Sequence, residues 1–150
     1  MRGSLAAGRR SASIVGSAAV LAAPVEPYRI GRPYHRRGAG LLEIPIGVTA
    51  RGRLPFLGTA LSLAGPRASR WIASGMARRG FASLELHAID LCDATDAGLG
   101  PLAARQTDLR VSRVRKERSL RGAIEVLRDQ GRRFTTLAEV AERDHTVAPV

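Results

Sequence analysis

The chain has 150 residues, of which 45% are hydrophobic, a length that suits one domain with its own core. Arginine, glycine or proline interrupts every apolar stretch well before the length of about 18 residues that a membrane-spanning helix needs. Cys92 is the only cysteine, which excludes an internal disulfide and a cysteine-based zinc site. We therefore expect a cytoplasmic protein, or one that is peripheral to a membrane.

The formal net charge of +11 is typical of proteins that bind polyanions. Two features argue against a nucleic-acid partner. Lys116 is the only lysine, and the arginines are scattered from Arg2 to Arg143. Aromatic residues, which stack on single-stranded nucleic acid, make up 4% of the chain. A non-catalytic basic α/β protein that binds nucleic acid or an anionic glycan is therefore kept as the alternative function.

Residues 1–40 are rich in glycine, serine, proline and arginine without sustained periodicity, and they predict irregular structure with a short helix at residues 18–23. The first 23 residues also mimic an export signal, because arginines precede an apolar run from Ser13 to Ala23. No small-x-small cleavage site follows, so export is not expected, and a small secreted protein is only a third interpretation.

The next two segments are apolar. Residues 41–49, LLEIPIGVT, predict a buried strand, in which Pro45 removes a ladder hydrogen bond and favours an edge or a bulge. Residues 54–63 combine apolar and small side chains, which suits either a short helix or a loop packed over the core.

A helix is predicted over residues 67–79. Pro66 suits its first turn, and Gly80 is a natural stop. Three large apolar residues recur three to four apart and are expected in the core: Trp71, Ile72 and Met76.

Period-two spacing in residues 81–88 predicts a second strand, with Leu84 and Leu86 on one face and Glu85 and His87 on the other. Residues 89–108 follow as a broken, acidic loop, which reverses the basic character of the chain and is compatible with a functional segment.

The clearest helix pattern covers residues 113–130, with Gly131 as its C-terminal cap. A short strand is expected at residues 133–135, after which Thr136 and Glu139 form a T-x-x-E capping box for a last helix through about Arg143. The order strand, loop, helix, strand, helix predicts an α/β domain with parallel strands and flanking helices.

His87 is the strongest candidate for chemistry, because reacting groups in parallel α/β folds gather at the carboxyl ends of strands. An imidazole exchanges protons near neutral pH, and Asp90 or Asp93 is placed to orient it. A satisfied structural histidine is the alternative interpretation of this position.

The sequence gives little support for a metal site or for a known catalytic motif. His87 and Asp90 form only a weak metal pair, for which His35 and His145 are unconvincing third ligands. The chain also has no nucleophile elbow, P-loop, H-E-x-x-H or C-x-x-C motif.

Four blocks in order resemble the C-terminal half of polysaccharide deacetylases of the NodB-homology type. They are GRRSASIVG with LAAPVEPYRIG, LLEIPIGVTARGRLPFLGT, SLELHAIDLCDA, and QTDLRVSRVRKERSLRGAIEVLRDQGRRFTTLAEVA. The resemblance implies a partial β/α barrel and a metal-dependent hydrolase, usually with zinc, that removes acetyl groups from N-acetylated glycans or glycolipids. It makes His87 the general acid and Leu86 a wall of the acetyl pocket, with Asp90 as an orienting partner although its spacing departs from the family pattern.

The family's aspartate pair and metal-binding histidines have no counterpart here, since neither T-F-D-D nor H-x-x-x-H occurs. The sequence therefore predicts no metal ligands in this chain and a C-terminal fragment that is inactive alone. Residues 1–40 would then be interior sequence of a longer domain, residues 41–143 the C-terminal part of the barrel, and residues 144–150 a tail.

Overall fold

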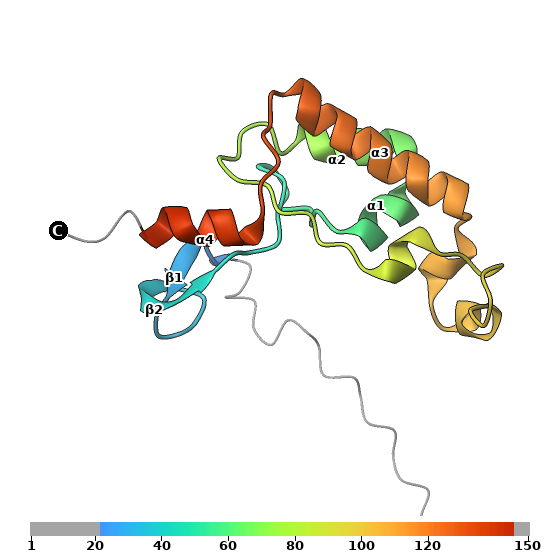
Figure 1. Cartoon of the computed structure of the whole chain (residues 1–150), viewed down its shortest axis with the longest axis horizontal. Helices are drawn as coiled ribbons and strands as arrows, with labels where there is room; N and C mark the ends of the chain where they lie inside the picture. The colour runs from blue at the N-terminus through green and yellow to red at the C-terminus, as the bar shows by residue number, and fades with distance from the viewer. Residues whose placement is uncertain (1–21, 146–150) are drawn as a thin grey trace, which may run out of the picture.

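A computed structural model of the chain describes residues 22–145, and most of the segment predicted as an export mimic and short helix lies outside them. Figure 1 shows β1, β2 and α4 at one end of the molecule and α1, α2 and α3 at the other. The elements are β1 (Tyr28–Ile30), β2 (Arg37–Glu43), α1 (Gly58–Ala64), α2 (Pro66–Ser74), α3 (Arg113–Asp129) and α4 (Leu137–His145), with short 3₁₀ helices η2 (Ala88–Leu91), η3 (Gly100–Ala104) and η4 (Thr107–Arg110).

β1 and β2 form an antiparallel hairpin, in which Tyr28 pairs with Glu43. The two sides of the hairpin approach each other closely: a Cβ at Gly38 would lie 2.4 Å from the Cα of Gly31. The structure therefore differs from the sequence prediction in two ways. Residues 28–40 contain ordered strands, and the strand expected over residues 41–49 ends at Glu43 and pairs antiparallel.

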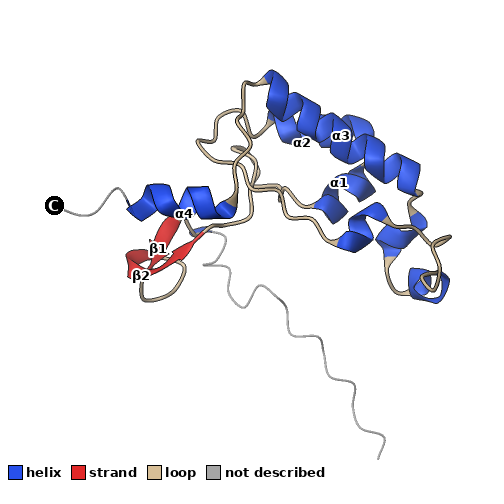
Figure 2. Ribbon diagram, in the orientation of Figure 1, coloured by secondary structure: helices blue, strands red, loops and turns tan. Residues whose placement is uncertain are grey.

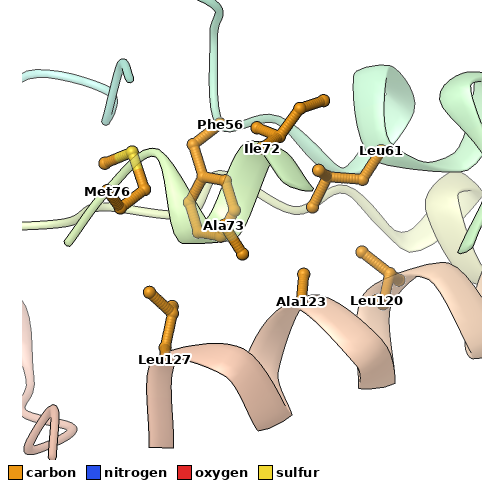
Figure 3. Packing of buried hydrophobic residues seen from close by; sticks show 8 residues of the cluster. All are labelled: Phe56, Leu61, Ile72, Ala73, Met76, Leu120, Ala123 and Leu127. Atoms are coloured by element: carbon orange, nitrogen blue, oxygen red, sulfur yellow. The ribbon is translucent and has the colours of Figure 1, made fainter. Parts of the chain in front are cut away.

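The core lies where α1 and α2 pack against α3 (Figure 3). Ala73 and Ala123 are fully buried, and their small side chains let the two helices approach closely. Where α2 crosses α3, the stem of Arg70 passes over Gly122, and its guanidinium donates to Glu125 at 3.1 Å. The other members of the cluster are Phe56, Leu61, Ile72, Met76, Leu120 and Leu127.

α2 is shorter than predicted, because it ends at Ser74 rather than near Gly80. The guanidinium of Arg132 donates to the carbonyl oxygens of Met76 and Arg79, which holds the following residues as a turn. Trp71, expected in the core, is 67% exposed. The buried side of α2 passes through Ser69, Ile72 and Ala73, which lie about 100° to 160° around the helix from Trp71.

The parallel strands predicted at residues 81–88 and 133–135 are not formed as regular strands within the described part of the chain (Figure 2). Residues 83–87 are extended but form one isolated parallel bridge, between Leu57 and Glu85. The described residues thus contain mixed helix and strand with one two-stranded antiparallel sheet. A partial β/α barrel stays a prediction.

Two predicted helix boundaries are confirmed, the end of α3 and the start of α4. At the end of α3, Gly131 has φ 73° and its N–H donates to Arg128, while the N–H of Arg132 donates to Leu127 at 3.1 Å, which is a Schellman motif. At the start of α4, the N–H of Thr136 donates to Glu139 at 2.7 Å and the N–H of Glu139 donates back to the Thr136 hydroxyl at 3.2 Å. α4 continues to His145, beyond the predicted end.

Candidate functional site

His87 lies at the end of the extended segment 83–87, immediately before η2, with φ −112° and ψ 156°. Its imidazole is 65% exposed and faces two carboxylates. The distance from Nε2 to Glu85 Oε1 is 3.4 Å, and the distance from Nδ1 to Asp90 Oδ2 is 3.9 Å. The ring is therefore open to solvent, with one carboxylate near each of its two nitrogens.

Asp90 is fully buried and acts mainly on the backbone of His87. Its Oδ2 accepts the N–H of His87 at 2.8 Å, and its Oδ1 accepts the hydroxyl of Thr59 at 2.7 Å. Asp90 thus fixes the main chain that carries the imidazole, while 3.9 Å is too long for a hydrogen bond to the ring. Its role as the orienting partner of His87 stays a prediction.

Two chain segments reach this site side by side. The N–H of Gly58 donates to the carbonyl of Glu85 at 2.9 Å, and each segment then enters a helix, α1 in one case and η2 in the other. A Cβ at Gly58 would lie 2.4 Å from Asp90 Oδ2 and 2.6 Å from Leu86 Cδ2, so only glycine leaves room here. Leu86, the predicted wall of an acetyl pocket, is 47% exposed.

Lys116 ties this region to α3, and the sequence prediction missed it. The side chain is fully buried, and Nζ donates to the carbonyl of Ile89 at 2.9 Å and to Asp108 Oδ2 at 3.3 Å. One ammonium group therefore joins η2, η4 and α3. The available signal was the residue type, since Lys116 is the only lysine in a chain with 24 basic residues.

Asp93 and Asp96 hold the start of α3 rather than the imidazole. Asp93 Oδ2 accepts the N–H of Arg113 at 2.7 Å, and Asp96 Oδ1 lies 3.5 Å from the Arg113 guanidinium. The hydroxyl of Thr95, followed by the N–H groups of Arg113 and Thr95, lowers the pKa of Asp93 to about 2. Asp93 and Asp96 of the acidic segment therefore stabilise the start of α3.

The described residues do not fit a zinc site. No three side chains among their histidines, cysteines, aspartates and glutamates come together in a way that would hold a metal ion. His35 lies in the turn between β1 and β2 and forms no such group with His87 and Asp90, and His145 is the last residue of α4. No chemical step can be derived through a metal from these residues.

Comparison with known proteins does not assign a family: no family model, curated protein or solved structure matches the chain. Among residues 22–145, no helix is both long and apolar enough to cross a membrane.

Replacing Lys116 by methionine should destabilise the fold by about 3–5 kcal/mol, because the carboxylate of Asp108 would remain buried without its counter-charge. Urea unfolding followed by far-UV circular dichroism measures this loss. The matched control is Arg118→Met on the exposed side of α3, which should change stability by less than about 0.5 kcal/mol. The double variant Lys116→Met/Asp108→Leu should recover part of the loss. If Lys116→Met and the control Arg118→Met destabilise the chain equally, the buried ion pair is not the cause.

The lowered pKa of Asp93 predicts a pH dependence. Because its folded value of about 2 lies below the ordinary 3.8, its contribution to stability is complete above pH 3.8 and is lost as the pH falls towards 2. Carboxyl-carbon NMR titration should give the depressed value in the wild type and a value closer to 3.8 in Thr95→Ala, which lacks the hydroxyl that contributes most. An unchanged pKa in Thr95→Ala would refute this cause.

Proposed function

We propose that this chain supplies the histidine side of a carbohydrate N-deacetylase centre, which hydrolyses acetamido groups of N-acetylated glycans or glycolipids. The observation that carries the proposal is the exposed imidazole of His87, held by the buried Asp90 at the carboxyl end of an extended segment. The resemblance of SLELHAIDLCDA to the deacetylase histidine motif supports the same assignment.

In this proposal His87 is the general acid, which gives a proton to the amine nitrogen as the amide C–N bond breaks. Glu85 and Asp90 lie near its two ring nitrogens, at 3.4 Å and 3.9 Å. Leu86 offers a half-exposed apolar side chain beside it, which suits the methyl of an acetyl group. The described residues lack a metal set, so we expect the isolated chain to release no acetate.

NMR spectroscopy of the histidine ring signals tests this proposal on the chain as it exists. We expect N-acetylated chito-oligosaccharides to shift the His87 signals saturably and to leave the His35 signals unchanged. Leu86→Ala should weaken the binding about tenfold, because it removes a buried apolar contact worth roughly 1–3 kcal/mol. Fully deacetylated oligosaccharides lack the methyl group and are the matched control, and equal shifts with both sugars would contradict the proposed acetyl pocket.

Activity provides a second arm. In a longer protein that contains this chain and releases acetate, His87→Ala should lower turnover by roughly 10²-fold or more, with His35→Ala as the control. An unchanged rate would remove His87 from the mechanism. Acetate release by residues 1–150 that a chelator abolishes would overturn the expectation that this chain is inactive alone.

One observation favours the alternative function, a protein that binds polyanions. Three arginines of the β1–β2 hairpin, Arg32, Arg36 and Arg37, are exposed, and within the described residues none forms an ion pair. Tyr34, which is also exposed, lies between them in the sequence. The guanidinium of Arg37 lies 5.9 Å from the centre of the Tyr28 ring. Exposed guanidinium groups without an ion pair, in a hairpin that also carries an exposed aromatic ring, suit phosphate, sulfate or carboxylate groups on a polymer.

A salt titration of heparin binding tests this alternative. Replacing Arg32, Arg36 and Arg37 by serine should lower the slope of log affinity against log salt by up to about 3, because each lost contact releases roughly one counterion fewer. The matched control replaces three exposed arginines of α3, Arg118, Arg121 and Arg128, and removes the same total charge. Equal losses in both triple variants would show attraction by net charge alone.

A further inference from the structure

A groove of about 1150 Å³ runs between residues 80–86 on one side and residues 131–140 on the other. Four large apolar side chains on its lining remain substantially exposed: Ile46, Leu86, Phe134 and Leu137. Exposed apolar side chains that gather along one groove usually mark a surface that binds something, because each costs free energy in water.

The backbone of this groove has an unpaired edge. Ser83 and Glu85 use their backbone groups on one side, where Ser83 accepts from Gly47 at 2.9 Å and Glu85 accepts from Gly58 at 2.9 Å. Alternate residues of an extended chain point to opposite edges, so Leu84 and Leu86 direct their N–H and C=O groups to the other side. There, within the described residues, these groups form no hydrogen bond.

An unpaired edge next to an apolar groove suits a strand with small or medium apolar side chains. We propose that residues 13–21 of the same chain, SIVGSAAVL, occupy this groove and pair with the edge of Leu84 and Leu86. This segment lies outside the described residues, carries no charge and, when extended, spans roughly 30 Å, which is ample for the edge.

The short tether between residues 13–21 and the groove supports this occupant. The first described residue, Ala22, is followed within five residues by Pro27, which lines the groove. Glu26 fixes the approach, because its Oε1 accepts the N–H of Gly80, another lining residue, at 3.1 Å. Such a short tether gives residues 13–21 a high effective concentration at the groove.

A second copy of the chain is a poorer occupant. Each copy has a formal net charge of +11, so two copies repel each other, whereas the tethered segment is uncharged. The inference does not rest on the ring of His87, but it shares one side chain with the proposed acetyl pocket. Residues 13–21 in the groove would cover Leu86, so the segment and an acetyl group compete for this side chain.

Amide hydrogen exchange of the full chain, followed by NMR spectroscopy, tests the inference. In the wild type we expect the Leu84 and Leu86 amides to be protected, and in Val20→Arg to exchange at least about tenfold faster, because the groove lining already carries Arg132 and Arg133, which repel a further cation. The matched control is Leu5→Arg, which adds the same charge outside residues 13–21 and should leave both rates unchanged. Unchanged exchange of the Leu120 and Leu127 amides in α3 shows that the variant remains folded.

Disulfide mapping is the second measurement. In a Cys92→Ser chain that carries Leu86→Cys, a single cysteine moved through positions 14 to 21 should cross-link at alternate positions, as a paired strand requires. Fast exchange of both amides in the wild type, or wild-type exchange in Val20→Arg, overturns the proposal. Protection that rises with protein concentration also overturns it, because the occupant would then be a second copy.

Discussion

The ammonium group of Lys116 imposes the strongest constraint on this structure. A buried charge is tolerated only when oxygen atoms surround it, and here they come from Ile89 in η2 and Asp108 in η4. The acidic segment must therefore fold back onto α3. Lysine suits this place because its charge is compact and its donors rotate, whereas a planar guanidinium is wider. Since Ile89 adjoins Asp90, the same contact also fixes the backbone on which His87 stands.

The parts that were predictable from the sequence rest on signals within a few residues. Gly131 and the apolar spacing before it gave the end of α3, and the box of Thr136 and Glu139 gave the start of α4. Both motifs satisfy backbone groups of their own helix, so they need no knowledge of the remaining chain. The exposure of His87 and its extended backbone also follow from its local sequence, because period-two spacing places it opposite Leu84 and Leu86.

What the sequence did not reveal depends on partners distant along the chain. Residues 81–88 have the pattern of a strand, but a regular strand needs a neighbour along its whole length, and the described residues provide only the bridge at Leu57. The burial of Lys116 likewise depends on Asp108 and Ile89 arriving from other elements. Asp90 is close to His87 in sequence, yet its contact with Thr59 across 31 positions decides that it faces inward and binds the main chain.

The position of Trp71 affects how the folding of this protein can be observed. This only indole of the chain sits on the outer surface of α2, in contact with water, while the core around Phe56 and Met76 contains no tryptophan. Its fluorescence emission in the native chain should already resemble that of a solvated indole, so denaturation will change the spectrum little. An optical assay based on intrinsic emission would therefore underestimate how cooperatively the interior melts.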